Sequence, residues 1–303
     1  MRLFYVRKLA SKKLMNKKIT GDERSFRKAW RTSKESSYNH WTAGPVQNQV
    51  QFAFRNHFEV FDGLIGPRRG KKNRRFLEVG CGRGSLSSYF AAAGWDCTLV
   101  DISPEVIAIA RKIFSKNKQR AKFVVGDANR LPFEDGSFDA VASIGLFEHF
   151  EQIQKPISEQ IRILAPGGVF LGYIVPKYLD NLQKDFAWIN EILKGYASEH
   201  RGAPAKQKVY RSDHPSGAYL KVMKKLGLRR LGASGIYSLP MISHSIEFPF
   251  TLMPPRAEAA LVKHFQEIFA KRRKMSHRHP WLCREGEGQA FLVWGYKQIK
   301  NRS

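Results

Sequence analysis

The stretch that decides the fold reads Arg75-Phe76-Leu77-Glu78-Val79-Gly80-Cys81-Gly82-Arg83-Gly84. Its first five residues are mostly apolar and predict a short buried strand. The three glycines that follow can turn the chain tightly and let a ligand approach bare backbone. Residues 85–93 then carry apolar side chains at helical spacing, so the stretch predicts a strand, a glycine turn and a helix whose first N–H groups point to the turn.

Strands and helices alternate downstream of this stretch, and an amphipathic helix at residues 46–65 precedes it. Alternation of this kind builds a parallel sheet with helices on both faces, so we predict an α/β fold. The predicted strands are residues 97–100, 122–125, 138–143, 168–175, 229–237 and 290–296, and the later helices are 156–164, 218–226 and 257–271.

Asp101 stands at the end of the second predicted strand. After it, Ser103, Pro104 and Glu105 supply a capping hydroxyl, a first-position proline and an early acid, which predict the start of a helix. An acid at the end of this strand accepts hydrogen bonds from ribose hydroxyls. Together with the glycine turn, Asp101 predicts a site for a nucleoside cofactor.

The glycine turn distinguishes two classes of cofactor. The dinucleotide pattern would place its third glycine where this chain has Ser85. In addition, the carboxylate of Glu78 would repel a pyrophosphate, whereas it suits the ammonium group of an amino acid. The turn therefore favours a methyltransferase over an enzyme that uses a nicotinamide or flavin.

The segment from Phe76 to Pro176 resembles the class I S-adenosylmethionine-dependent methyltransferases, in particular the branch that acts on small molecules. The resemblance implies a doubly wound, Rossmann-like, three-layer α/β/α fold with a seven-stranded sheet whose last strand is antiparallel. It also implies S-adenosylmethionine as the cofactor. The motifs that carry it are residues 78–84, 100–103, 126–128, 131–133, 137–141, 148–150 and 164–168.

The resemblance implies roles for individual residues. Gly80 and Gly82 would face the methionine, Asp101 the ribose and Ile102 the adenine face. Ser143 and Ile144 would lie beside the methionine. Asp127 and Ala128 would meet the adenine edge, although Asp127 would otherwise be interpreted as a turn-forming acid. The full expected cofactor set is Glu78, Gly80, Cys81, Gly82, Gly84, Asp101, Ile102, Asp127, Ala128, Ser143 and Ile144.

Two adjacent residues after the fourth predicted strand are the expected catalytic groups, His149 and Glu148. A histidine with an ordinary pKa of about 6.5 suits proton transfer at neutral pH, although His149 could instead cap the next helix. Residues 143–150 resemble the fatty-acid cyclopropane synthases, which implies an active-site role for Glu148. Quinone O-methyltransferases have a further glutamate where this chain has Gly145, so we predict no metal site.

Charge is the unusual feature of the composition, with 52 basic and 26 acidic residues and a net charge of +26. Residues 1–34 hold twelve Lys and Arg, and further clusters lie at residues 68–75 and 271–274. A positive electrostatic field of this kind attracts an anionic membrane, RNA or an acidic small substrate. The alternative interpretation is a basic surface that only contacts solvent. The three dispersed cysteines favour a reducing compartment, and we expect a cytoplasmic protein. Peripheral association with a membrane and targeting to an organelle are the alternatives.

We expect a basic N-terminal helical arm or lid at residues 1–45 and a methyltransferase domain at residues 46–303. Within the domain, residues 66–176 form the cofactor half, residues 177–214 an insertion after the fifth strand that shapes the acceptor site, and residues 215–303 the C-terminal half. The expected activity is methyl transfer to a small-molecule or lipid-like acceptor. The alternatives are an RNA methyltransferase, a lipid-modifying enzyme like the cyclopropane synthases, and a non-catalytic cofactor-binding protein.

Overall fold

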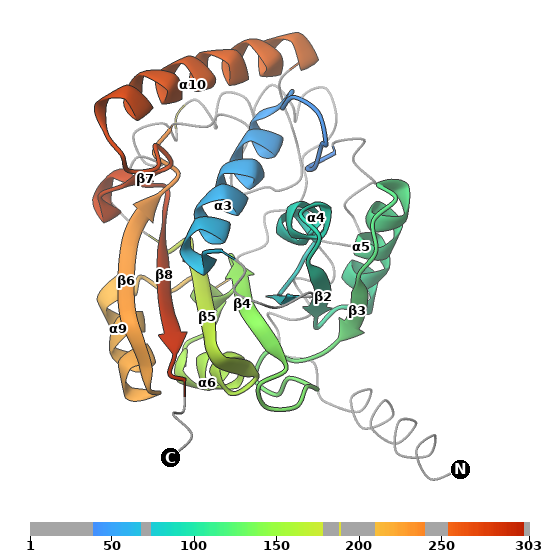
Figure 1. Ribbon diagram of the computed structural model, residues 1–303, viewed down its shortest axis with the longest axis vertical. Helices are drawn as coiled ribbons and strands as arrows, with labels where there is room; N and C mark the ends of the chain where they lie inside the picture. Colours follow the sequence, from blue (N-terminus) through green and yellow to red (C-terminus); the bar gives the residue numbers. More distant parts are fainter. Residues whose placement is uncertain (1–38, 68–73, 178–187, 189–209, 240–253, 300–303) are drawn as a thin grey trace.

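A computed structural model of the chain describes residues 39–67, 74–177, 188, 210–239 and 254–299. Its strands form one sheet in the order β3-β2-β1-β4-β5-β8-β6-β7 (Figure 1). The strands are β1 Arg75–Val79, β2 Asp96–Asp101, β3 Lys122–Val125, β4 Phe138–Ile144, β5 Leu164–Ile174, β6 Leu228–Ile236, β7 Leu282–Cys283 and β8 Ala290–Lys297.

Strands β1 to β5 run parallel, and β8 lies antiparallel between β5 and β6. The predicted doubly wound class and the antiparallel last strand are confirmed. The predicted number of seven strands is wrong, because the sheet has eight. The additional strand, β7, is two residues long and pairs with the end of β6, so it is too short to produce a visible alternation in the sequence.

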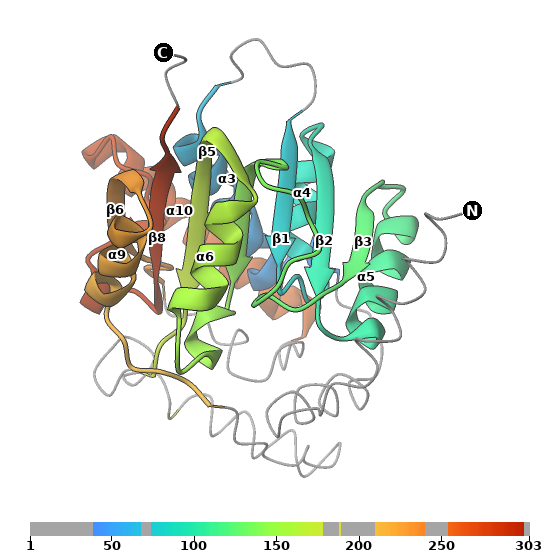
Figure 2. The ribbon, with the colours of Figure 1, turned by 90° about the horizontal axis from the view of Figure 1, so that it is seen from below.

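Helices cover both faces of the sheet (Figure 2). Residues of α6 and α9 pack into the core on one face, and residues of α3, α4, α5 and α10 pack into the core on the other. The helices are α3 Gln49–Ile65, α4 Ser85–Ala92, α5 Pro104–Lys116, η1 Phe147–His149, α6 Gln154–Arg162, α9 Ser216–Lys225, α10 Pro255–Met275 and η2 Glu285–Glu287.

Aromatic side chains fill the core where the sheet meets its helices. On the α4 face, Phe76 of β1 stacks on Phe90, with ring centroids 4.0 Å apart. On the opposite face, Phe147 of η1 packs against Phe170 and Tyr219, and all three rings are buried. The Phe147 cluster lies at the edge of the sheet where β4 ends, because η1 follows that strand directly.

Most element boundaries agree with the sequence to within a few residues. Helix α3 begins at Gln49 rather than Val46, because the side chain of Asn48 caps it by accepting the Gln51 N–H at 2.8 Å. Helix α10 continues to Met275. Residues 1–38 of the expected arm, the basic residues 68–73, and residues 178–187 and 189–209 of the expected insertion lie outside the described residues.

None of the helices within the described ranges is long and apolar enough to span a lipid bilayer.

Candidate active site

The glycine turn after β1 requires glycine for two reasons. Gly80, Gly82 and Gly84 have φ values of 67°, 51° and 70°, in the left-handed region that L side chains rarely adopt. A Cβ atom on Gly80 would also lie 2.8 Å from Cδ1 of Leu146, in the loop after β4. The turn therefore packs directly against the segment that leads into η1.

Backbone hydrogen bonds hold the turn against the end of β2. The N–H groups of Gly80 and Cys81 both donate to the carbonyl of Val100, at 2.9 and 3.1 Å. The Gly82 N–H donates to Oδ2 of Asp101 at 3.2 Å. The two features that the sequence singled out as a cofactor site are thus in contact.

Asp101 is placed to accept further hydrogen bonds. Its Oδ1 accepts the Ser103 N–H at 3.0 Å, next to the helix start that the sequence predicted. Burial raises the pKa of Asp101, and the backbone donors oppose that rise. Because a carboxylate has about four acceptor positions, the carboxylate of Asp101 retains the capacity to accept hydrogen bonds from a pair of hydroxyls.

Glu78 is buried and ties β1 to the start of α4. Its Oε2 accepts the hydroxyl of Ser87 at 2.5 Å and the Ser87 N–H at 3.0 Å. Burial raises the pKa of Glu78 to about 7, although the bonds from Ser87 lower it. An acid that satisfies first-turn N–H groups stabilises the helix, so Glu78 has a structural role in addition to the predicted cofactor contact.

Asp127 forms a turn at the end of β3. Its Oδ1 accepts two hydrogen bonds from Asn129, one from the backbone N–H at 2.9 Å and one from the side-chain amide at 3.1 Å. The Gly126 N–H donates to the carbonyl of Asp101 at 2.9 Å, which brings the turn beside the ribose-binding candidate. The interpretation of Asp127 as a turn-forming acid is therefore confirmed, while its contact with adenine, like that of Ala128, stays a prediction.

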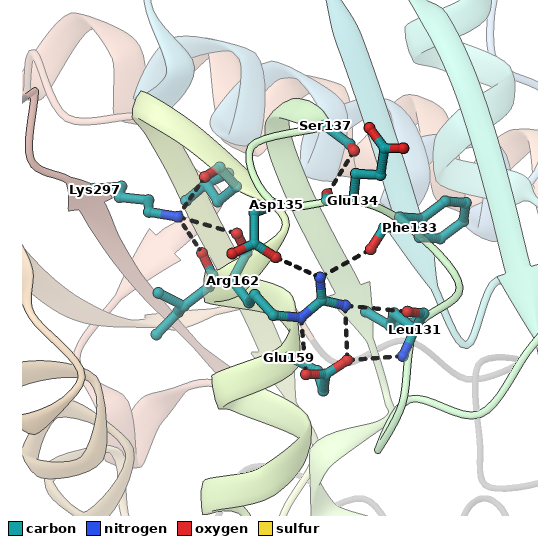
Figure 3. Close-up of polar contacts among 10 residues, drawn as sticks. Leu131, Phe133, Glu134, Asp135, Ser137, Glu159, Arg162 and Lys297 are labelled. Carbon is teal, nitrogen blue, oxygen red and sulfur yellow. Dashed lines mark hydrogen bonds and ion pairs between the residues drawn. The ribbon is translucent and has the colours of Figure 1, made fainter.

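A side-chain cluster that the sequence analysis missed fixes the loop after this turn (Figure 3). The guanidinium of Arg162, the last residue of α6, donates to the carbonyls of Phe133 and Leu131 at 2.8 and 3.1 Å. It also pairs with Glu159 at 2.9 Å and Asp135 at 2.7 Å. We call these five residues the Arg162 cluster; it links residues 131–135 to α6.

The carboxyl end of β4 leads directly into η1. Ser143 is fully buried, and its Oγ has no hydrogen-bond partner within the described part of the chain. Ile144 is half-buried and ends the strand, and the following Gly145 has a φ of 65°. The predicted pair beside the methionine therefore lies on the segment that contacts the glycine turn.

Glu148 in η1 is buried, with 1% of its surface exposed. Its Oε1 accepts the Val175 N–H at 3.4 Å, whereas Oε2 has no hydrogen-bond donor among the residues that the structure describes. Burial raises the pKa of Glu148 to about 7, and the positive charge of Arg211 opposes that rise. A buried carboxylate oxygen without a donor is unusual in a folded protein and requires an explanation.

His149, the next residue, contacts the described end of the insertion. Its Nδ1 lies 2.7 Å from the carbonyl oxygen of Tyr210. Because a carbonyl only accepts, Nδ1 carries the hydrogen, and Nε2 is the basic nitrogen of the neutral ring. The alternative role of His149 as a helix cap is wrong, since the N-cap of α6 is Ile153 and has no side-chain cap bond.

The two described ends of the insertion meet over η1. The Lys177 N–H donates to the carbonyl of Ser212 at 2.9 Å, and the Ser212 N–H donates to the carbonyl of Glu148 at 2.8 Å. The predicted insertion therefore starts and ends at the candidate catalytic residues. Sequence spacing could not reveal this closure, because Lys177 and Ser212 pair only in the folded chain.

A second contact that sequence analysis missed holds the glycine turn from the N-terminal side. Nδ1 of His40 lies 2.7 Å from Oγ of Ser85, the first residue of α4, and both side chains are buried. The hydroxyl of Tyr89 donates to the carbonyls of His40 and Gln51, at 3.3 and 3.1 Å. The chain before α3 is thus anchored beside the cofactor candidate.

Comparison with known proteins gives the family. A family model described as a methyltransferase domain matches residues 77–172. Demethylmenaquinone methyltransferase of Thermus thermophilus is 36% identical over 164 residues, which cover 50% of this chain and 73% of that protein. The chain belongs to the class I S-adenosylmethionine-dependent methyltransferases, and S-adenosylmethionine is its cofactor.

Other relatives are similar over shorter parts. Norajmaline N-methyltransferase of Rauvolfia serpentina is 38% identical over 108 residues, covering 34% of this chain and 37% of that protein. This chain spans 32% to 42% of the length of three curated relatives, the norajmaline enzyme among them. The structure of Haemonchus contortus phosphoethanolamine N-methyltransferase 2 has the same fold, with a TM-score of 0.50, 19% identity, and coverage of 94% of this chain and 59% of that one.

Proposed function

We propose that this protein transfers the methyl group of S-adenosylmethionine to a small-molecule acceptor. The observation that carries the proposal is that the glycine turn accepts no side chain beside Leu146 and bonds to Asp101, which supports a cofactor position next to η1. The norajmaline and demethylmenaquinone methyltransferases are named for small molecules, which supports this class of acceptor over RNA. The demethylmenaquinone enzyme also supports a lipid-like acceptor.

The cofactor would lie across the ends of β1, β2 and β4. In this proposal the methionine part meets the glycine turn, with Glu78 and Ile144 nearby, and the ribose binds Asp101. Ile102, Asp127 and Ala128 hold the adenine. Methyl transfer from a sulfonium needs alignment of the acceptor and exclusion of water, and alignment alone contributes up to about 7–11 kcal/mol.

His149 is the proposed proton acceptor, through Nε2, for an acceptor that loses a proton. The hydrogen bond from Nδ1 to Tyr210 supports this role because it orients the ring and places the basic lone pair on Nε2. General-base help of this kind is typically worth about 10²–10⁴-fold in rate.

Calorimetry and transfer of a labelled methyl group test the proposed function. The purified protein should bind S-adenosylhomocysteine and not NAD, and should move label from S-adenosylmethionine into the small molecules of a cell extract. His149→Ala should lower turnover by about 100-fold with unchanged affinity for S-adenosylhomocysteine. A protein that binds NAD but neither form of the cofactor would refute the proposal, and unchanged turnover would remove His149 from the mechanism.

We also propose an anionic membrane surface as a partner and a cytoplasmic location. The net charge of +26 supports the first, together with exposed Lys271, Arg273 and Lys274 near the C-terminal end of α10. The free thiols of Cys81, Cys97 and Cys283 support the second, because a reducing compartment keeps cysteines unpaired.

A further inference from the structure

Glu148 has a position and an environment that the fold alone does not explain. Its carboxyl group is 1% exposed, and one oxygen is used by the Val175 N–H while the other has no donor in the described parts of the chain. Packing alone would favour an apolar side chain here, since burying a carboxylate without full pairing is unfavourable. Arg211 contributes a positive charge to this environment, but no described residue donates a hydrogen bond to Oε2, and a donor from a ligand at the carboxyl edge of the sheet would fill that position.

The location of Glu148 separates it from the nucleoside part of the cofactor. The glycine turn and Asp101 follow β1 and β2, whereas Glu148 contacts Val175, just beyond the end of β5. Leu146, two residues before Glu148, lies so close to the turn that a Cβ on Gly80 would come within 2.8 Å of its Cδ1. Glu148 therefore lies beyond the methionine end of the cofactor candidate, on the side where an acceptor has to enter.

We propose that Glu148 binds the acceptor, and that the acceptor is an amine whose N–H group donates to the unpaired oxygen Oε2. The inference rests on the proposed methyltransferase function and specifies its substrate class. Burial raises the pKa of Glu148 to about 7, so a cationic neighbour readily converts the group to its carboxylate form.

The charge changes during the reaction favour nitrogen over oxygen. The amine lone pair forms the new N–C bond while the S–C bond breaks and its electrons stay on sulfur, which becomes a neutral thioether. The positive charge passes from sulfur to nitrogen, and the carboxylate of Glu148 stabilises it there. A phenolate or alkoxide nucleophile would instead be repelled by the same carboxylate.

The wild-type chain provides the first test. It is incubated with methyl-labelled S-adenosylmethionine and the small-molecule fraction of a cell extract. Unreacted S-adenosylmethionine, which is itself a sulfonium cation, is first removed by reversed-phase chromatography, and the remaining products are separated by cation exchange at acidic pH. We expect label in the retained fraction, which contains methylated amines. Label confined to the unretained fraction, or no label in a protein that binds S-adenosylhomocysteine, overturns the amine proposal. Failure to bind S-adenosylhomocysteine contradicts the proposed function itself.

Glu148→Gln provides the second test, with Glu151→Gln as the matched control because Glu151 is exposed three residues later. For the labelled amine, Glu148→Gln should lower kcat/KM by about 100-fold, as loss of one preorganised electrostatic group typically does. Its affinity for S-adenosylhomocysteine should match that of the wild type and of the control. Equal kcat/KM in variant and wild type, or weakened binding of S-adenosylhomocysteine, overturns the assignment of Glu148 to the acceptor.

Discussion

At the scale of the residue, the candidate site is characterised by three carboxyl groups. Glu78, Asp101 and Glu148 are each held at a strand end, and burial raises the pKa of all three. The groups that oppose these rises differ, however: Ser87 acts on Glu78, backbone N–H groups act on Asp101, and backbone N–H groups with the charge of Arg211 act on Glu148. Glu148 differs from the other two in having one carboxylate oxygen, Oε2, without a hydrogen-bond donor among the described residues.

Asp101→Asn tests the ribose contact. Asparagine can still accept the Gly82 N–H, but it loses the charge that strengthens hydrogen bonds from ribose hydroxyls, which contribute about 1.5–3 kcal/mol when a charged group takes part. Calorimetry should show at least about tenfold weaker binding of S-adenosylhomocysteine. An unchanged dissociation constant would exclude Asp101 from the cofactor site.

Glu148→Gln should stabilise the folded protein above neutral pH. The pKa of Glu148 is raised from 4.5 to about 7 by folding, so the native state holds the proton more tightly than the unfolded state. Its contribution to stability is thus fully present below pH 4.5 and is lost as the pH rises through 7. The free energy of unfolding of the variant minus that of the wild type should therefore increase between pH 5 and pH 8. We expect an increase of up to about 3 kcal/mol.

Urea denaturation at pH 5 and pH 8 measures this difference, with Glu151→Gln as the control. If the wild type and Glu148→Gln respond alike to pH, the carboxyl group of Glu148 is not buried in an unfavourable setting.

At the scale of the element, the Arg162 cluster connects α6 to the loop that follows β3. Glu159 completes it by accepting the Leu131 N–H at 2.9 Å, so the side chains of α6 satisfy both backbone polar groups of Leu131. Lys297 of β8 adds support from the other side, where its Nζ donates to three carbonyls at the end of α6 and the start of β5 (Figure 3). Asp127 and Ala128 lie at the start of the loop held in this way.

Arg162→Ala should destabilise the protein by about 1.5–3 kcal/mol, because it removes charged hydrogen bonds to two backbone carbonyls. It should also weaken binding of S-adenosylhomocysteine through the loosened loop. Arg162→Lys keeps the charge but cannot reproduce the planar fork, so it should recover only part of the loss. Full recovery by lysine would show that charge alone, and not the geometry of the guanidinium, holds the loop.

Charge is the property that belongs to the whole molecule. Lys271→Ala and Lys274→Ala should each weaken binding to phosphatidylserine vesicles by about fivefold, since a basic residue near an anionic surface contributes about 1 kcal/mol. Lys155→Ala, on α6 at the opposite face, is the control. Sedimentation with phosphatidylserine and phosphatidylcholine vesicles at low and high salt measures the effect. Equal binding to both lipids would reject the anionic surface.

The sequence by itself determined the class of fold and the location of the cofactor candidate. Strand and helix periodicity, the glycines of the turn and the acid at Asp101 are local signals, because each residue type is required by the backbone conformation or the hydrogen bonds at its own position. The strand number was missed, since the two residues of β7 carry no periodicity and pair with β6 only through the folded chain.

Only the tertiary structure decided how the catalytic candidates are surrounded. The contact of His40 with Ser85, the bonds that join Lys177, Ser212 and Glu148, and the lack of a donor to Oε2 of Glu148 within the described ranges all depend on segments far apart in the sequence. Burial and hydrogen-bond partners at such positions are set by which chain segments pack together, and no spacing of residues along the chain encodes them locally. For this reason the sequence could name Glu148 and His149, but their different environments emerged from the fold.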